Sequence, residues 1–238
     1  MTAEEKKSVA FFVDLASSQA RGGYFPGERE YCFSDDLKAD DSLVSQVNPD
    51  KITDDIRNCK ACRLCETRKN TVPGEGAPEP LVMVIGEAPG ADEDSSGRPF
   101  VGKAGQLLDK MLGSINLSRE SNCFIANIIK CRPPENRDPQ PDEIAACAGF
   151  LECQIQSLKP RFILCVGRLS SQALLHSTEP VGKLRGRFMD CKIAGMTIPL
   201  IATYHPSALL RNEDLKRPSW DDLKLLRSAL GSAPAGVK

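Results

Sequence analysis

Residues 81–90 read LVMVIGEAPG, and this stretch decides the fold class. The continuous apolar run at 81–85 is typical of a strand that is buried on both faces of a parallel sheet. Gly86 and Gly90 allow backbone conformations that other residues resist, and Pro89 fixes one backbone angle, so the chain turns sharply where the strand ends. We therefore expect the backbone N–H groups of this turn to face a ligand at close range.

Strand and helix patterns alternate along the chain that follows. Short apolar runs are separated by segments whose apolar residues recur with helical spacing. Such alternation predicts an α/β fold, a three-layer α/β/α sandwich with a mostly parallel, four-stranded central sheet. The strands are expected at 81–86, 123–130, 161–167 and 196–204, and the helices at 105–112, 142–158, 170–175 and 220–230.

Composition changes along the chain and suggests its domain limits. Residues 1–50 contain few apolar residues and an acidic run, which favours a largely flexible N-terminal extension. The strand and helix patterns fill residues 51–231, which predicts a single domain there, and residues 232–238 form a short tail. A chain of 238 residues is long enough for one sizeable domain with such extensions.

Polar or glycine residues lie at or just past the end of each predicted strand. Glu87 follows the first strand, Asn127 lies near the end of the second, Gly167 ends the third and His205 follows the fourth. Ligands of parallel sheets bind at the carboxyl ends of the strands. We therefore expect these positions to meet at one edge of the sheet and to form a site.

The charge balance excludes a protein that coats nucleic acid through its overall charge. The formal net charge is -1, so any contact with nucleic acid needs a local basic patch. Such a patch is available late in the chain, where the cations are Lys183, Arg185, Arg187, Arg211, Lys216 and Arg217.

The ten cysteines are best explained as thiols and ligands in a reducing compartment. The chain starts with charged residues instead of an apolar signal, and no apolar run is long enough to cross a bilayer. We therefore expect a cytoplasmic protein that does not bind membranes.

Four of the cysteines have the spacing of a metal site. Cys59 and Cys62 form a C-x-x-C pair, and Cys131 and Cys147 form a wide pair with fifteen residues between them. Thiolates from two such distant pairs hold either an iron–sulfur cluster or a structural zinc ion. Cys65 extends the first pair to C-x-x-C-x-x-C, so the choice of ligands is not forced. Buried thiols without metal are the alternative.

The loop after residue 86 is acidic, which excludes some ligands. Glu87 and the carboxylates at 92–94 make it a poor cradle for phosphates, and its spacing matches neither the P-loop nor the dinucleotide fingerprint. A solvated turn with surface acids is the plainer interpretation. Phe100 lies in a glycine-bounded segment and could stack on a planar base, although the residues alone favour a core position.

Taken together and in this order, the motifs resemble those of the family 4 uracil-DNA glycosylases, the iron–sulfur branch of their superfamily. The motifs are GEAPG at 86–90, GRPFVGKAG at 97–105, Asn127 before KCRPP at 130–134, and HPS at 205–207. The resemblance covers about residues 55–231. It implies a [4Fe–4S] cluster and a monofunctional hydrolase that removes uracil from single- and double-stranded DNA, the first step of base excision repair.

The resemblance also implies residue roles. Cys59, Cys62, Cys131 and Cys147 match the cluster ligands.

For catalysis, Glu87 matches the glutamate of the first motif and His205 the histidine of the second. Backbone N–H groups near Ala88 would help to stabilise the departing base.

For substrate binding, Phe100 matches the phenylalanine that stacks on uracil and Asn127 the asparagine that reads its edge. Glu93 lies where many members carry an acid.

Contacts with DNA are expected late in the chain. Either Leu209 or Leu210 would fill the gap left by a flipped base, and the phosphate contacts would come from Ser207, Arg211, Lys183 and Arg185, with Lys216 and Arg217 as further candidates.

The loop after the second predicted strand indicates whether the product is released. The loop at 132–139 contains no histidine, whereas relatives that trap uracil covalently carry one, so turnover is expected.

A monomer is expected, with a replication or repair protein as its partner. The alternatives are a non-catalytic iron–sulfur module that binds DNA, and an unrelated zinc-stapled protein.

Overall fold

The computed structural model describes residues 48–232. The predicted N-terminal extension, except for its last residues, and nearly all of the predicted tail lie outside this range. Helix α2 begins at Pro49, within two residues of the predicted start of the domain.

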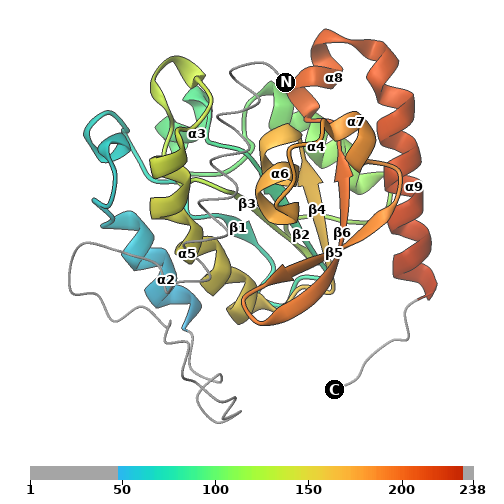
Figure 1. The fold of residues 1–238 in the computed structure, drawn as a ribbon, viewed down its shortest axis with the longest axis horizontal. Coiled ribbons are helices and arrows are strands. Elements are labelled where there is room, and N and C mark those ends of the chain that lie inside the picture. The colour runs from blue at the N-terminus through green and yellow to red at the C-terminus, as the bar shows by residue number, and fades with distance from the viewer. Residues whose placement is uncertain (1–47, 233–238) are drawn as a thin grey trace.

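A six-stranded sheet forms the centre of the fold, with the strand order β1-β3-β2-β4-β6-β5 (Figure 1). The four inner strands are parallel to one another, and each edge strand is antiparallel to its neighbour. The strands are β1 Glu75–Gly76, β2 Val82–Gly86, β3 Cys123–Asn127, β4 Phe162–Val166, β5 Phe188–Ile193 and β6 Met196–Thr203.

The prediction of an α/β/α sandwich is confirmed, but the predicted number of four strands is wrong. The four predicted strands are the inner ones, and the two edge strands were missed. β1 has two residues, too few to leave an alternating pattern. β5 joins β6 through Ala194 and Gly195, whose φ values of 53° and 73° are those of a two-residue type I′ hairpin turn. The Ala-Gly pair is a weaker signal of such a turn than Asn-Gly.

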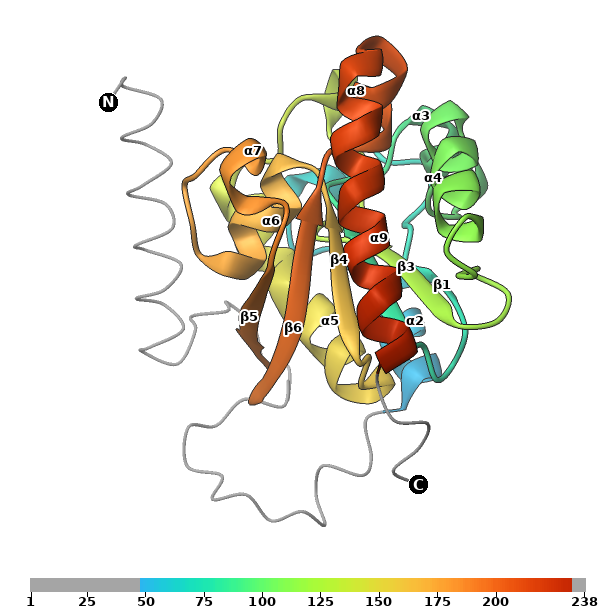
Figure 2. The same ribbon diagram turned by 90° about the vertical axis from the view of Figure 1, so that its right-hand side faces the viewer.

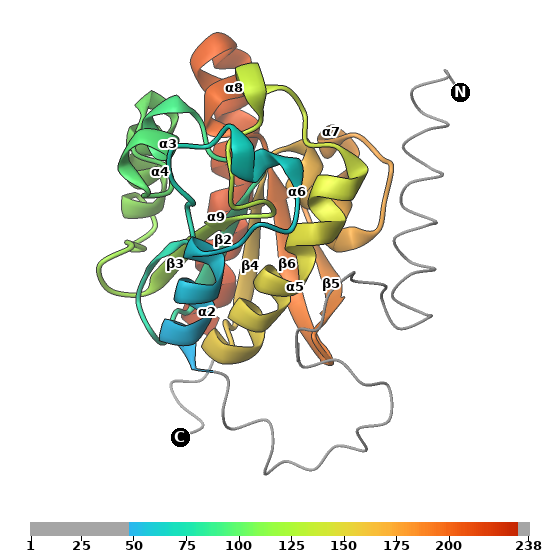
Figure 3. The ribbon, with the colours of Figure 1, turned by 90° about the vertical axis from the view of Figure 1, so that its left-hand side faces the viewer.

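Helices cover both faces of the sheet. Figures 2 and 3 view the molecule from opposite sides: α9 lies in front of the sheet in Figure 2, and α2 and α5 lie in front of it in Figure 3. The α-helices are α2 Pro49–Arg57, α3 Ala91–Ser96, α4 Lys103–Gly113, α5 Pro141–Leu158, α6 Arg168–Leu175, α7 Val181–Leu184, α8 Pro206–Arg211 and α9 Lys216–Ser232, and the 3-10 turns are η2 Arg63–Glu66, η3 Pro134–Asn136 and η4 Glu213–Leu215.

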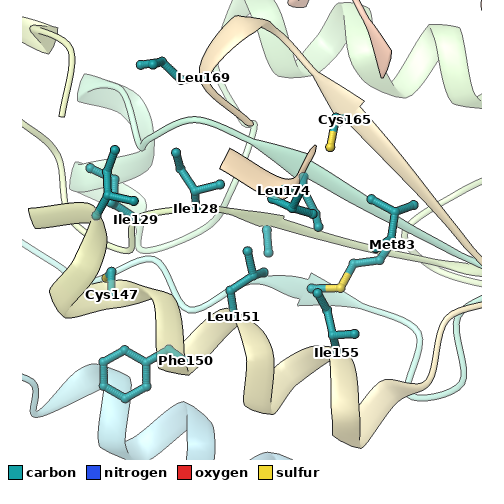
Figure 4. Packing of buried hydrophobic residues seen from close by; sticks show 14 of the residues in the cluster. Met83, Ile128, Ile129, Cys147, Phe150, Leu151, Ile155, Cys165, Leu169 and Leu174 are labelled. Atoms are coloured by element: carbon teal, nitrogen blue, oxygen red, sulfur yellow. The ribbon is translucent and has the colours of Figure 1, made fainter. Parts of the chain in front are cut away.

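Successive side chains of β2 point to opposite faces of the sheet, which explains why the core has two hydrophobic layers. Met83 and Ile85 pack into the cluster under α2, α5 and α6, whereas Val82 and Val84 pack into the cluster under α4 and α9. Figure 4 shows the first layer, with Leu151 reaching from α5 toward the sheet. Both faces of β2 are therefore buried, as its continuous apolar run requires.

No helix in the 48–232 range is long and apolar enough to cross a membrane.

Candidate active site

The carboxyl ends of the four parallel strands bring the predicted polar residues together. Gly86 pairs with Asn127 at the ends of β2 and β3, and Val166 pairs with Thr203 at the ends of β4 and β6. Glu87, Gly167 and His205 follow directly, so all lie along one edge of the sheet. The expectation that these positions converge is confirmed.

Phe100 forms one wall of the site. Its ring centroid lies 5.7 Å from that of His205, with 34° between the planes. The residue is buried, yet its backbone has a φ of 52°, a left-handed conformation that is rare for an aromatic residue. Non-glycine residues in this region cluster at functional sites, where the surrounding structure maintains the strain.

Phe100 and Asn127 both pack directly against Gly86. A Cβ atom built on Gly86 would lie 2.4 Å from Asn127 Oδ1 and 2.5 Å from Phe100 Cζ. The three residues therefore surround one point, and a side chain at position 86 would occupy it.

Asn127 is buried but its side-chain oxygen has no partner. The residue is 1% exposed, and Oδ1 accepts no hydrogen bond within the described structure. A buried acceptor without a partner costs free energy, typically about 1–3 kcal/mol. An arrangement of this kind is typical of a site that a ligand with an N–H group completes.

The backbone of Asn127 is held by a buried polar chain. Lys130 Nζ donates to the Asn127 carbonyl over 2.9 Å and to Gln154 Oε1 over 2.7 Å. Gln154 Nε2 in turn donates to the carbonyl of Pro73 over 2.8 Å. Sequence reasoning missed Lys130 and Gln154, because a buried lysine in a strand extension leaves no periodic signal.

His205 is neutral at neutral pH, and its tautomer follows from its contacts. Burial lowers its pKa to about 4, with the Arg211 charge as the next cause, while Glu93 opposes the shift. The backbone N–H of Ser207 donates to His205 Nδ1 over 3.1 Å, and Ser207 Oγ lies 2.7 Å from the same nitrogen. Nδ1 is thus an acceptor, so the ring proton is on Nε2.

Glu87 titrates near neutrality. Its pKa is raised to about 7, mainly by partial burial and next by the Asp138 charge, while Arg168 opposes the shift. Asp138 and Arg168 form an ion pair over 2.5 Å between the loop before α5 and the start of α6. Sequence reasoning missed both residues. Arg168 follows Gly167 at the same strand edge, so its position was a usable signal.

Glu93 shapes the loop instead of facing the open site. Its carboxylate accepts from the backbone N–H groups of Gly90, Val101 and Gly102 over 2.9–3.0 Å. These bonds connect the turn after β2 to the segment that carries Phe100. The side chain of Ala88, in the same turn, packs at the border of one core cluster.

The four predicted cysteine ligands lie within electrostatic range of one another. Burial raises the pKa of the Cys131 thiol, and Cys62 and Cys59 add to the shift. Burial likewise raises the pKa of Cys147 to about 12, with smaller contributions from Cys131 and Cys59. The segment after α2, the loop before α5 and α5 itself therefore place all four sulfurs in one region.

Hydrogen-bond donors face three of these sulfurs. Ala61 N–H donates to Cys59 Sγ over 3.4 Å, Lys130 N–H donates to Cys147 Sγ over 3.4 Å, and Arg68 Nη1 lies 3.1 Å from Cys131 Sγ. Such donors stabilise thiolate sulfurs. Within residues 48–232, however, no three histidine, cysteine or carboxylate side chains are grouped as the ligands of a single metal ion.

The predicted DNA-contacting residues lie on or next to α7 and α8. Leu210 is 50% exposed, whereas Leu209 is 2% exposed and belongs to the core, so Leu210 is the leucine available for insertion. Arg211 is exposed, and Lys183 is an exposed partner of Glu179. Ser207 is occupied with His205.

Arg185 has a different environment from the one expected of a phosphate contact. Its guanidinium donates to both oxygens of the fully buried Asp222 over 2.9 and 2.8 Å, and to the carbonyl of Pro218. Thr203 Oγ1 donates to the same carboxylate over 2.8 Å. These bonds attach α9 to the end of β6, directly before the segment that carries His205.

Replacing Asp222 is therefore expected to destabilise the protein. Asp222→Ala leaves the largely buried Arg185 without its counter-ion, and breaking a buried pair in this way costs about 3–5 kcal/mol. Denaturant unfolding measures the free energy. The neighbouring Asp221→Ala serves as control, because Asp221 pairs with Lys224 at the surface and its removal should leave the unfolding midpoint nearly unchanged. Equal midpoints for the two variants would contradict the expectation.

Comparison with known proteins agrees with this geometry. Residues 73–224 match the model of the uracil DNA glycosylase superfamily. A type-4 uracil-DNA glycosylase from Saccharolobus solfataricus is 45% identical over 192 residues, which is 79% of this chain and 88% of that protein. The type-4 enzyme of Pyrobaculum aerophilum is 45% identical over 179 residues, or 74% of this chain and 91% of the relative. That of Archaeoglobus fulgidus is 38% identical over 186 residues, or 76% and 93%. The resemblance carried by the sequence motifs is confirmed, and the chain belongs to the type-4 uracil-DNA glycosylases of the uracil DNA glycosylase superfamily.

Proposed function

We propose that this protein removes uracil from DNA by hydrolysing the bond between the base and deoxyribose. The observation that carries the proposal is that Phe100 lies against His205 and beside Gly86 and Asn127, at the sheet edge where Glu87 follows β2. Water adds to the sugar carbon, the uracil anion leaves and takes up a proton, and an abasic site remains in the DNA.

Asn127 and Phe100 select the base. The unpartnered Oδ1 of Asn127 accepts the N3–H of uracil, and the amide nitrogen donates to O4. Cytosine carries an acceptor at N3 and a donor at position 4, so both contacts would fail and a buried polar mismatch would result. Stacking on Phe100 adds about 1–3 kcal/mol and is independent of the base.

His205 stabilises the leaving group. A neutral imidazole with its proton on Nε2 donates a hydrogen bond to the negative charge that develops on uracil O2. The contact with Ser207 fixes the ring before the reaction begins. A preorganised donor of this kind is worth about 3 kcal/mol in the transition state, and the backbone N–H near Ala88 assists.

Glu87 acts on the sugar side. In its ionised form it stabilises the oxocarbenium-like sugar or orients the attacking water. Glu93 holds the turn that carries Glu87, because its carboxylate accepts hydrogen bonds both from this turn and from the segment after Phe100.

The DNA lies across α7 and α8. A stacked base cannot be surrounded by protein, so the uracil must flip out of the helix at a cost of a few kcal/mol. Leu210 fills the gap that the flipped base leaves in the DNA. Arg211 and Lys183 contact phosphates, and Ser207 contacts the DNA backbone beside the flipped nucleotide. Arg185 contributes indirectly, by holding the chain before His205 through Asp222.

Cys59, Cys62, Cys131 and Cys147 hold a [4Fe–4S] cluster. The sulfur-directed donors support charged thiolates, the form in which cysteines bind iron–sulfur clusters. These four cysteines would hold the bound cluster between the segment after α2, the loop before α5 and α5 itself.

A matched pair of cysteine variants tests this assignment. Cys147→Ser is expected to lose the broad absorption near ~400 nm and the bound iron, because a serine oxygen is a poor ligand for the cluster. Cys191→Ser, at a buried thiol on β5 that faces Leu174, should keep both. Iron and sulfide analysis of anaerobically purified protein gives the measurement, and a colourless wild type would contradict the cluster.

The oligomeric state, the cellular compartment and the partner of the protein are also part of what we propose. The protein acts as a monomer on uracil-containing DNA, in a reducing compartment such as the cytoplasm, where the nine cysteines of residues 48–232 stay outside disulfide bonds. A replication or repair protein is the partner class that fits this activity.

The decisive experiment is excision from oligonucleotides that contain one uracil, either single-stranded or opposite guanine or adenine. Alkali-labile breaks should appear at uracil without added metal or nucleotide, and matched strands with cytosine or thymine should remain intact. The double variant Glu87→Gln, His205→Ala serves as the control for contaminating activity. Breaks that persist undiminished in this variant would reject the roles of Glu87 and His205.

A further inference from the structure

A buried arginine holds the backbone of the stacking residue. Arg119 lies between α4 and β3 and is 7% exposed. Its Nη1 donates to the carbonyl of Pro99 over 2.9 Å, and its Nη2 donates to the carbonyl of Phe100 over 3.0 Å. We propose that Arg119 is a positioning residue that fixes the Phe100 ring in the uracil-stacking orientation, an inference that rests on the proposed function.

The Phe100 backbone needs such support. Its φ of 52° is disfavoured for a side chain with a Cβ atom, and a strained residue relaxes unless its neighbours prevent it. A peptide rotation at this residue would move the ring away from His205 and Gly86. Both adjacent carbonyls must therefore be held, and the two amino groups of one guanidinium hold them.

The guanidinium is itself fixed from the opposite side. Asp109 Oδ1 accepts from Arg119 Nε over 3.2 Å and from Nη2 over 2.8 Å. Glu75 lies 3.8 Å from Nη1 and also accepts two hydrogen bonds from Arg98, over 2.7 and 2.6 Å. Arg98 directly precedes Pro99, so the segment 98–100 is held by side chains on two sides.

Gly105 packs against the same carbonyl. A Cβ atom at this position would lie 1.9 Å from Phe100 O. The first turn of α4 thus passes directly behind the Phe100 peptide, which leaves Arg119 as the group that satisfies the carbonyl. Because the planar fork of arginine reaches two acceptors at once and a lysine ammonium is a point charge, lysine cannot replace it.

The plainer alternative is that Arg119 only stabilises the fold. Two variants separate the possibilities. Arg119→Lys keeps the charge and loses the fork. Arg119→Met removes all donors and leaves no buried charge unpaired, since Asp109 is half exposed and Glu75 keeps Arg98. Asp109→Asn is the control, because it weakens the packing of the guanidinium but leaves both carbonyl bonds in place.

The measurements are single-turnover excision, inhibition by free uracil, and thermal unfolding, with rates corrected for the folded fraction. For both Arg119 variants we expect kcat/KM and uracil affinity to fall about 5- to 100-fold, the range that loss of a base–aromatic stack produces. Asp109→Asn should lower the melting temperature while both values stay within about twofold of wild type. In a Phe100→Ala background, Arg119→Lys should cause no further loss, because the two residues act as one unit.

Four outcomes overturn the inference. Arg119 variants that match the wild type in uracil affinity would leave only a structural role. Losses that simply multiply in the Phe100→Ala background would show that the two residues act independently. A wild type that releases no uracil would reject the proposed function and this inference together, whereas normal release by wild type and Arg119 variants alike would reject the inference alone.

Discussion

The kcat/KM of uracil excision is expected to fall about tenfold for each pH unit below 7 and to be constant above it. In the proposed mechanism Glu87 must be ionised to stabilise a positive sugar, and burial is the main cause that raises its pKa to about 7. A raised carboxyl pKa means that the active, charged form is lost as the pH falls through 7, well above the pH at which an exposed glutamate protonates. His205, with a pKa of about 4, adds no transition near neutrality.

Variants of Glu87 and its neighbours identify the group that titrates. Glu87→Gln should lower kcat/KM about 100- to 1,000-fold at pH 8, since it removes a charge aimed at the transition state, and the acid limb should vanish. Asp138→Asn should move the limb to lower pH, because Asp138 raises the Glu87 pKa, and Arg168→Gln should move it to higher pH. An unchanged limb in Glu87→Gln would assign the titration to another group and reject this account.

The assigned carboxylate and imidazole have opposite protonation requirements, and the same burial meets both. Removal from water disfavours charge, which raises the Glu87 pKa and lowers that of His205. In the proposed mechanism the imidazole is therefore uncharged when it meets the uracil anion. The carboxylate, in contrast, is close to half protonated at pH 7. The charge of the exposed Arg168, at the start of α6, lowers the Glu87 pKa and so raises the fraction of Glu87 that is ionised.

The sequence predicted the parts of the fold that depend on local pattern. Continuous apolar runs identified the four inner strands, and their ends located Glu87, Asn127 and His205, because parallel strands share one carboxyl edge. The two edge strands were missed, since β1 is too short and the β5–β6 turn lacks the usual residues.

Contacts between distant residues could not be predicted. Arg185 looked like a phosphate ligand, yet it pairs with Asp222, 37 residues later. Arg119 reaches Phe100 from 19 residues away, and nothing near either residue indicates the bond. A charged side chain in a loop has the same local pattern whether it faces solvent or a buried carbonyl, so only the folded chain distinguishes them.

Gly86→Ala is expected to abolish most activity while the fold survives. The added Cβ would meet Asn127 Oδ1 at 2.4 Å and the Phe100 ring at 2.5 Å. Both contacts are side chains and not backbone, so these two buried groups must shift at some cost in stability while the strands keep their positions. The groups that shift are those that we assign to base binding, and misplacing reacting partners by about 1 Å costs about 100-fold in rate. We therefore expect kcat/KM to fall at least about 100-fold, with free uracil losing affinity in parallel.

Gly149→Ala is the matched control, because this glycine lies within α5 and a Cβ there meets nothing within 4 Å. It should retain full activity and gain about 0.5–1 kcal/mol in the free energy of unfolding, as alanine favours a helix interior. Oligonucleotide excision and denaturant unfolding of the two variants separate occlusion of the site from damage to the fold. If Gly86→Ala excised uracil at the wild-type rate, the base could not lie between Asn127 and Phe100. The selection of uracil over cytosine would then require a different pocket.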